Sequence, residues 1–252
     1  MGEKVRLDRL LVDRGLCESR TRAQALVVAG KVRVAGKRED KPGTLVTLDA
    51  AVDVDGPEHP FVSRGGVKLA GALDAFAQLE IAGKVAMDVG ASTGGFTDCL
   101  LQRGASRVHA VDVGYGQLSW KLASDARVVV HDRTNIRTLD PAAIGEAIEL
   151  VVADCSFIAS AKVIPHLPKF LARPAAAVVL VKPQFELDPS RIGKGGIVRD
   201  PGDHEAAVEA ATVAARNAGF QVAGRAPSVL PGRDGNREFF LWLQWAAGSE
   251  RS

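Results

Sequence analysis

The first thirty residues carry a helical pattern of apolar positions. Apolar residues recur at every third or fourth position in two stretches, 6–16 and 20–30. The first predicted helix ends at Gly15, and the second begins after the N-cap residue Ser19 and ends at Gly30. Two short helices are therefore expected.

Beyond residue 30 the apolar positions alternate with polar ones. Val32 and Val34 lie on one side of a predicted strand, and the Ala-Gly pair that follows suits a tight turn. Two more short apolar runs, 44–48 and 51–56, predict further strands. We expect a small α/β domain over residues 1–55.

The rest of the chain contains seven apolar runs of strand length. They occupy residues 84–89, 107–113, 127–132, 148–154, 175–183, 220–226 and 237–245. Helical stretches are expected between them, and this alternation predicts a doubly wound, largely parallel α/β sheet whose ligand lies beyond the carboxyl ends of the central strands. We expect this domain over 66–246, after a linker at 56–65 that is rich in proline and glycine, with a tail at 247–252.

Composition narrows the class of protein. The 252 residues are 46% hydrophobic and 25% charged, as in ordinary globular proteins. No apolar run reaches the roughly 18 residues of a membrane span, and the first residues do not form a signal peptide, so a cytoplasmic protein that does not contact membranes is expected. The three cysteines and five histidines lack ligand spacing, so we expect neither a metal site nor a disulfide framework. The sequence indicates no obligate protein partner.

Charge is concentrated near the N-terminus. Residues 1–41 hold eleven Lys and Arg against six Asp and Glu, whereas residues 42–60 hold four acids and no base. A polyanionic partner is therefore expected. The first sixty residues contain no aromatic side chain for base stacking, so RNA recognition by shape and phosphate is favoured.

The stretch RGLCESRTRAQALVVAGKVRVAGK, residues 14–37, resembles the S4 RNA-binding domain. Basic residues in and beyond this module are the candidates for contact with RNA. They are Arg6, Arg20, Arg22, Lys31, Arg33, Lys37, Lys41 and Arg64.

A glycine-rich turn, GASTGG at residues 90–95, follows the first run of the larger domain. It lacks the Gly-Lys-Ser/Thr of a P-loop and the G-x-G-x-x-G of dinucleotide-binding turns. Asp88, just before it, would repel a pyrophosphate and attract an ammonium group. Asp112 and Asp132 end the next two runs, where they are placed to bind ribose hydroxyls and an adenine amino group.

Acids that end three successive strands are typical of S-adenosylmethionine (SAM) sites. SAM carries an ammonium, a sulfonium and no phosphate. The candidate residues for binding it are Asp88, Gly90, Ala91, Ser92, Thr93, Gly94, Gly95, Phe96, Asp112, Val113, Asp132 and Asp154.

Four polar residues are the candidates for catalysis. Asp154 and Lys182 end the fourth and fifth runs, Lys68 lies just after the linker, and Glu238 begins the last run. In order and context they resemble the Lys-Asp-Lys-Glu tetrad of FtsJ-like RNA 2′-O-methyltransferases. With the S4 module and the motifs VSRGG, GASTGGFTD, DVGYGQL, ADCSFI and LVKPQFE, the chain resembles the TlyA (hemolysin A) family.

The resemblance implies a methyltransferase sheet of seven strands, the last antiparallel, and SAM-dependent 2′-O-methylation of a cytidine in ribosomal RNA. The partner implied is ribosomal RNA or a ribosomal subunit. Lys182 is the candidate base, acting as the neutral amine, with Asp154 orienting it and Lys68 and Glu238 fixing the 2′-hydroxyl. The short C-terminal end favours the large subunit, with the small subunit as the alternative.

Other functions remain open from the residues alone. Cys155 is a conceivable nucleophile of a cytosine methyltransferase, although a buried structural thiol is favoured. A membrane-active hemolysin and a non-catalytic ribosome-assembly factor are the alternatives from other classes. The charged, glycine-rich stretch 186–200 is a candidate lid that contacts RNA.

Overall fold

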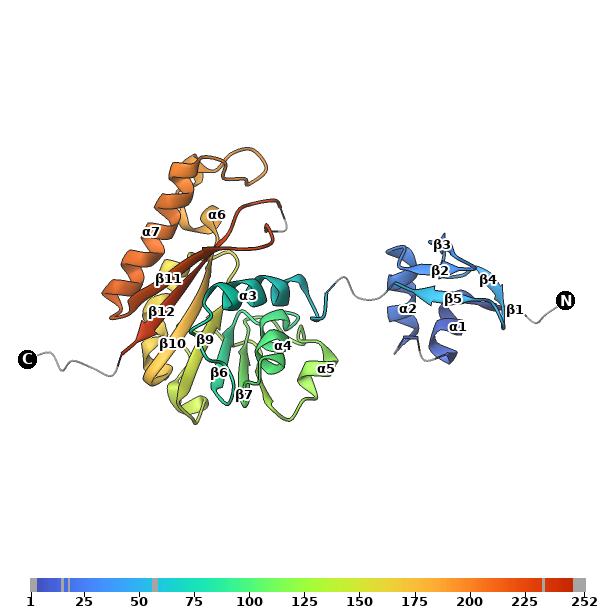
Figure 1. Cartoon of the computed structure of the whole chain (residues 1–252), viewed down its shortest axis with the longest axis horizontal. Coiled ribbons are helices and arrows are strands. Elements are labelled where there is room, and N and C mark those ends of the chain that lie inside the picture. The colour runs from blue at the N-terminus through green and yellow to red at the C-terminus, as the bar shows by residue number, and fades with distance from the viewer. Residues whose placement is uncertain (1–3, 15, 18, 56–58, 233, 247–252) are drawn as a thin grey trace, which may run out of the picture. The chain divides into compact units, whose positions relative to one another are not determined.

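A computed structural model describes residues 4–14, 16–17, 19–55, 59–232 and 234–246. The predicted helix end at Gly15, residues 56–58 of the expected linker and the expected tail 247–252 lie outside these ranges. The chain divides into an N-terminal unit, Met1–Pro60, and a second unit, Phe61–Ser252, and each is described by itself (Figure 1).

The N-terminal unit packs two helices against two small sheets. Its elements are β1 (Lys4–Arg6), α1 (Leu7–Asp13), α2 (Arg20–Val28), β2 (Val32–Val34), β3 (Lys37–Glu39), β4 (Leu45–Thr47) and β5 (Val52–Val54). Strand β1 pairs with β4, and β2 lies between β3 and β5, all antiparallel. Ser19 caps α2 as predicted, because its hydroxyl accepts a hydrogen bond from the Arg22 N–H at 3.2 Å. The core of the unit includes Leu7, Leu11 and Val27.

The second unit is built on one sheet of seven strands. They are β6 (Val85–Val89), β7 (Arg107–Val111), β8 (Val128–His131), β9 (Ile148–Ala153), β10 (Leu171–Val181), β11 (Gln221–Pro227) and β12 (Phe239–Trp245). Their order is β11-β12-β10-β9-β6-β7-β8. Among the described strands of this sheet, β12 alone runs in the direction opposite to the other six. The predicted fold class and the single antiparallel last strand are confirmed.

Both faces of the sheet are covered. Helices α3 (Arg64–Ala75) and α4 (Gly95–Gln102) pack on one face around Leu69, Leu100 and Phe240. Helix α7 (Pro201–Asn217) and several short turns cover the other face around Met87 and Val151. Arg64 and Gly65, assigned to the linker from the sequence, form the first turn of α3. No helix among the described residues is long and apolar enough to cross a membrane.

Apart from α7, the helical segments in the connections after β7 are shorter than expected from the sequence. They contain one-turn helices, α5 (Trp120–Ala123) and α6 (Pro183–Glu186), and five 3₁₀ turns. The 3₁₀ turns are η1 (Pro141–Ala143), η2 (Ser160–Lys162), η3 (Ile164–His166), η4 (Pro168–Phe170) and η5 (Pro189–Arg191). Pro165 and Pro168 fall within residues 160–170, where a proline inside a helix would remove a backbone hydrogen bond and clash with the preceding turn, so this stretch forms three 3₁₀ turns.

The order of the strands determines where a ligand binds. Strands β6 and β9 are neighbours although β7 and β8 lie between them in the sequence. The strands that follow β6, namely β7 and β8, lie toward one edge of the sheet, and β10, which follows β9, lies toward the other edge. Loops that leave the carboxyl ends of β6 and β9 diverge there and open a crevice.

Candidate active site

The glycine-rich turn brings the backbone of one strand end against the next. Gly90 follows β6 with a φ of +83°, and a Cβ built on it would lie 2.6 Å from the carbonyl oxygen of Asp154, which follows β9. Gly94 begins α4 with a φ of +95°, and a Cβ there would meet the side chain of Leu122 at 2.3 Å. Glycine is required at both positions by conformation and by space.

Asp88 is more deeply buried than its predicted role suggests. Its side chain is fully buried, and one carboxylate oxygen accepts hydrogen bonds from the N–H and hydroxyl of Thr97 in α4, at 2.9 and 2.7 Å. The other oxygen, Oδ1, has no hydrogen-bond partner among the described residues. Burial, with a smaller contribution from the charges of Asp154 and Asp112, raises the pKa of Asp88 to about 7.

A cavity of about 890 Å³ opens beside the glycine-rich turn, and we call it the Asp112 cavity. Gly90, Ser92, Asp112 and Val113 line one side of it, with apolar walls that include Ile136 and Phe185. Asp112 accepts hydrogen bonds from the N–H groups of Ser92 and Gly114, at 2.8 and 2.7 Å. The cavity therefore combines an anionic group with apolar surface.

Asp132 lies at the end of β8 but does not line this cavity. Its carboxylate accepts a hydrogen bond from the N–H of Gly116 at 3.0 Å. Residues Thr134, Asn135 and Ile136, which come just after it, are the ones that reach the cavity. In this structure Asp132 supports the loop around the cavity.

A second cavity of about 540 Å³, the Lys68 cavity, lies on the other side of the turn. Predicted site residues that line it are Arg64, Lys68, Gly90, Ala91, Ser92, Thr93, Gly95, Phe96 and Asp154. Gly90, Ser92 and Asp154 line both cavities. A molecule in the Asp112 cavity and one in the Lys68 cavity would therefore meet beside Asp154.

The four candidate catalytic residues form two ion pairs. The amine of Lys68 lies 2.5 Å from Oε2 of Glu238, and the amine of Lys182 lies 2.5 Å from Oδ1 of Asp154. Lys68, Lys182 and Glu238 are each less than a tenth exposed. Gly232 leaves space for the glutamate, because a Cβ there would lie 2.6 Å from its Oε1.

Sequence reasoning missed Ser156. The amine of Lys182 donates a hydrogen bond to the Ser156 hydroxyl at 2.9 Å, in addition to its pairing with Asp154. The signal was present in the motif ADCSFI, two positions after Asp154, but a serine in a loop has no distinguishing pattern. Ser156 gives the lysine a second fixed acceptor.

Cys155 is set apart from catalysis by its surroundings. Burial raises the pKa of the Cys155 thiol to about 12, and its sulfur lies 3.7 Å from the Val89 carbonyl oxygen. A thiol with this pKa carries very little thiolate at neutral pH. Cys155 is half-buried and lines the Asp112 cavity, but its raised pKa favours a structural thiol over a nucleophile.

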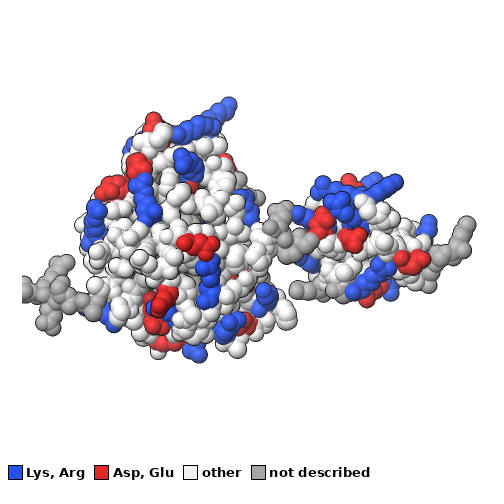
Figure 2. Space-filling view, in the orientation of Figure 1, with Lys and Arg blue, Asp and Glu red and all other residues white. Residues whose placement is uncertain are grey.

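The predicted RNA-binding residues of the N-terminal unit differ in their surroundings. Figure 2 shows Lys and Arg side chains gathered over this unit, with acidic residues among them. Arg22, Lys37 and Lys41 are exposed and have no ion pair among the described residues, whereas Arg33 pairs with Asp55 at 3.2 Å. Lys31 is half-buried.

Arg6 and Arg20 both contact a buried carboxylate, that of Asp8. Arg64 belongs to the second unit, where it is exposed at the Lys68 cavity.

The candidate lid, 186–200, is tied to the second unit at its C-terminal end. The buried side chain of Asn236 accepts a hydrogen bond from the Val198 N–H at 2.9 Å and donates one to the Gly196 carbonyl at 2.8 Å. Lys194, which precedes both of these residues in the stretch, is exposed. This anchor was not predicted from the sequence.

These observations fit the SAM predicted from the sequence. The turn brings backbone to the cavity wall with no side chain in the way, and Asp112 and Asp154 supply negative charge. A buried oxygen of Asp88 lies without a partner among the residues that the structure describes. A ligand with an ammonium and a sulfonium suits the carboxylates of this lining, which also contains Arg137 and Lys162.

Comparisons with known proteins identify the domains of the chain. A family model described as FtsJ-like methyltransferase matches residues 61–245, and one described as S4 domain matches residues 5–52. The methyltransferase model alone matches well over half of the chain.

Individual relatives match nearly the whole chain. A Mycobacterium tuberculosis protein named 16S/23S rRNA (cytidine-2′-O)-methyltransferase TlyA is 50% identical over 97% of this chain and 91% of its own length. Hemolysin A of Brachyspira hyodysenteriae is 38% identical over 93% of this chain and 98% of its own. A solved structure from Streptococcus thermophilus, 40% identical, covers 98% of this chain and 90% of its own, with a TM-score of 0.74.

Proposed function

The chain belongs to the TlyA (hemolysin A) family of FtsJ-like methyltransferases that carry an S4 domain, and on this basis we propose that it methylates the ribose 2′-oxygen of a cytidine in ribosomal RNA. One observation carries the proposal most strongly. Two lysine–carboxylate pairs with buried lysines, Lys68–Glu238 and Lys182–Asp154, accompany two cavities that share Asp154 as a lining residue. This is the arrangement that a reaction between two separately bound molecules requires.

SAM supplies an electrophilic methyl group on its sulfonium. We assign Asp112, Val113 and the backbone of Gly90 and Ser92 to holding it in the Asp112 cavity. The buried carboxylate of Asp88 adds negative charge behind the turn and fixes the start of α4 through Thr97. Phe96 packs against Phe240 and supports the wall of the Lys68 cavity.

Lys182 is the residue that we assign as general base. A ribose hydroxyl is a poor nucleophile, so its proton has to leave as the oxygen bonds to the methyl carbon and the carbon–sulfur bond breaks. The neutral amine of Lys182 accepts that proton, and Asp154 and Ser156 hold the resulting ammonium at 2.5 and 2.9 Å.

Lys68 and Glu238 hold the acceptor. The Lys68 amine lies at the wall of the Lys68 cavity and its position is fixed by Glu238. A paired ammonium there can donate a hydrogen bond to a ribose oxygen and keep the 2′-hydroxyl in line with the methyl group. Most of the rate enhancement then comes from positioning.

The substrate class follows from the family and the N-terminal unit. The M. tuberculosis relative is named for RNA of both subunits, so the large-subunit target expected from the sequence stays a prediction alongside the small subunit. A ribosomal substrate places the reaction in the cytoplasm.

Labelled methyl transfer tests the proposal. We would incubate the full chain with labelled SAM and with large and small ribosomal subunits from a strain that lacks the enzyme, digest the RNA to nucleosides and map the label. Label in 2′-O-methylcytidine is the expected result. Label in a methylated base, or RNA binding with no transfer, would overturn it and favour a base methyltransferase or an assembly factor.

A further inference from the structure

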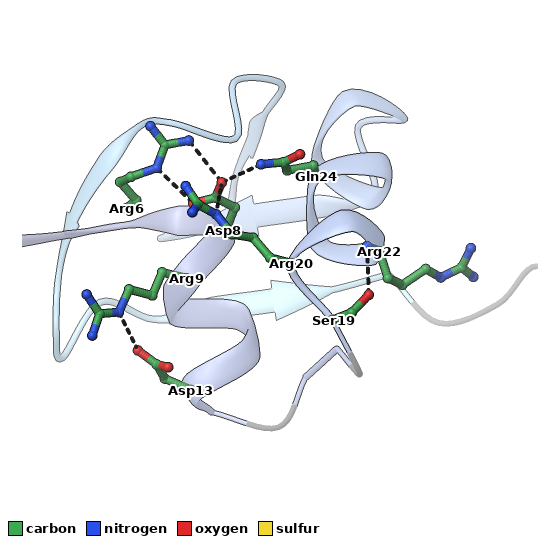
Figure 3. Close-up of polar contacts among 8 residues, drawn as sticks. All are labelled: Arg6, Asp8, Arg9, Asp13, Ser19, Arg20, Arg22 and Gln24. Carbon is green, nitrogen blue, oxygen red and sulfur yellow. Dashed lines mark hydrogen bonds and ion pairs between the residues drawn. The ribbon is translucent and has the colours of Figure 1, made fainter. Parts of the chain in front are cut away.

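A buried carboxylate joins two of the predicted RNA-binding arginines. Arg6 donates from Nε to Oδ1 of Asp8 at 3.0 Å and from Nη2 to Oδ2 at 2.9 Å, and Arg20 donates from Nε to Oδ2 at 3.0 Å. Gln24 adds an amide donor to Oδ2 at 2.8 Å. Figure 3 shows these three side chains converging on Asp8, whereas Arg22 points away.

Burial makes the hydrogen bonds at Asp8 obligatory. The Asp8 side chain is fully buried, and a carboxylate left unpaired there would be costly. The Arg6 hydrogen bonds are the largest cause that holds the pKa of Asp8 well below its usual range, and Gln24 and Arg20 add to the effect. Asp8 is therefore ionised at every physiological pH, and both arginines stay paired with it.

The same arginines remain half open to solvent. The side chains of Arg6 and Arg20 are 46% and 57% exposed. Arg6 uses two of the five N–H groups of its guanidinium for Asp8, and Arg20 uses one. The remaining N–H groups have no hydrogen-bond partner among the described residues and can bind a second anion. The distance between the two guanidinium groups is set by the one oxygen that they share, Oδ2 of Asp8.

The chain around Asp8 supports this geometry. The Asp8 N–H donates to the Pro42 carbonyl at 3.0 Å, which fixes the loop that carries Lys41 against the start of α1. Gly43 lies under the Arg6 guanidinium, where a Cβ would be 3.1 Å from Nη1. Three basic residues from β1, α2 and this loop therefore come from segments held around one carboxylate.

We propose that Asp8 is a positioning residue for RNA binding, which holds Arg6 and Arg20 as a fixed pair that binds phosphate groups of the RNA backbone. The inference rests on the proposed RNA substrate. Guanidinium groups held in advance lose less rotational freedom on binding than free arginines do, and they match the oxygens of a phosphate in a fork. An acidic residue thus strengthens binding to a polyanion.

Two variants that remove the same charge distinguish a positioning role of Asp8 from a simple effect of charge. D8N and D13N each remove one negative charge from α1, and Asp13 has only an exposed pairing with Arg9 at 3.5 Å. If charge alone mattered, both variants would bind RNA slightly more tightly. We expect D8N to raise the Kd for ribosomal subunits about tenfold, the cost of losing a charge-assisted hydrogen bond, and D13N to leave it unchanged or lower.

Two further measurements separate positioning from a general structural role. The slope of log Kd against log salt concentration should become shallower by about 1 for each phosphate group that the variant no longer binds. The KM for RNA should rise in D8N while kcat at saturating RNA stays within about twofold, because both cavities of the active site are lined by residues of the second unit. A folded D8N that binds RNA like D13N would overturn the inference.

If circular dichroism shows that D8N unfolds the N-terminal unit, a milder variant is used in its place. Q24M removes one uncharged donor to Asp8 and keeps every charge, and we expect it to raise the Kd about two- to threefold. An unchanged Kd in folded Q24M would overturn the inference.

The outcomes for the two proposals are distinguishable. Wild-type protein that binds subunits but transfers no methyl group overturns the proposed function and leaves the Asp8 comparison valid. Methyl transfer by the wild type, with equal KM values for D8N and D13N, overturns the role of Asp8 alone.

Discussion

At the scale of single residues, the proposed mechanism depends most on the amine of Lys182. It lies between the acceptors Asp154 and Ser156, less than a tenth exposed, at the carboxyl end of β10. A base held in this way needs no rearrangement to receive the proton of a hydroxyl. Its removal should therefore affect the chemical step far more than binding.

We expect Lys182→Ala to lower kcat for methyl transfer by about 10²–10⁴-fold, the usual contribution of a general base. SAM affinity should stay within a few-fold, because Lys182 does not line the Asp112 cavity. Single-turnover transfer and calorimetric titration with SAM measure the two effects. Lys169→Ala, at an exposed lysine that donates to the Leu139 carbonyl, is the control. Normal turnover by the Lys182 variant would remove it from the mechanism.

Asp88 should make stability depend on pH. Its pKa is raised from 3.8 to about 7 in the folded protein, so between about pH 4 and pH 7 the folded state binds more protons than the unfolded state. The free energy of unfolding then falls as the pH rises through that window and levels off above it.

The Asp88→Asn variant lacks this titration. Its free energy of unfolding relative to wild type should rise steadily from about pH 4 to pH 7 and then stay constant. Urea unfolding at several pH values measures the difference. Parallel curves for the two proteins would mean that the carboxylate is stabilised in the fold by a group other than Thr97.

The sequence predicted that the candidate site residues lie at one edge of the sheet, but not which of them form pairs. Asp88, Asp112, Asp154 and Lys182 each end an apolar strand, and carboxyl ends of parallel strands meet at one edge. Their pairing was not predictable, because Lys68 and Glu238 are 170 positions apart and Ser156 sits in an irregular loop. The hydrogen bonds of Asp88 to Thr97 likewise depend on how α4 packs, which no local pattern specifies.

At the scale of elements, the turn from β6 to α4 is under the tightest constraint. Gly90→Ala should destabilise the second unit and weaken SAM binding at least tenfold, because the new methyl meets backbone atoms of Asp154 that cannot move aside. Gly83→Ala is a matched control, since Gly83 has a φ of +77° but nothing within 4 Å of its Cβ position. That control should cost about 1–2 kcal/mol of stability with unchanged SAM affinity.

Thermal unfolding and SAM titration of both variants make the comparison. Equal losses of SAM affinity in the two proteins would show that backbone strain alone, and not the approach to Asp154, limits the turn.

Strands and helices differed in how well they could be predicted. Apolar runs marked all seven strands, whereas Pro165 and Pro168 interrupt the stretch 160–170 and leave it as 3₁₀ turns.

At the scale of the whole molecule, each described hydrophobic core belongs to one unit. Leu7, Leu11 and Val27 pack within the N-terminal unit, and the two clusters on the large sheet lie within the second. Folding of one unit is therefore expected to proceed with little help from the other.

We expect Leu11→Ala, at a fully buried position, to destabilise the N-terminal unit by about 2–5 kcal/mol and to leave SAM affinity unchanged. Hydrogen exchange resolved by peptide should show faster exchange in residues 4–55 and no change over the large sheet. Leu69→Ala, equally buried in α3, should give the reverse pattern. Loss of SAM affinity in the Leu11 variant would indicate that the units fold together.

The absence of aromatic residues from the first sixty positions has an optical consequence. All three tryptophans and the single tyrosine belong to the second unit, including Trp120 and Tyr115, which are 77% and 70% exposed. Intrinsic fluorescence therefore comes entirely from that unit. A change in emission when RNA is added reports an event at the large sheet, while docking confined to the N-terminal unit leaves the emission spectrum unchanged.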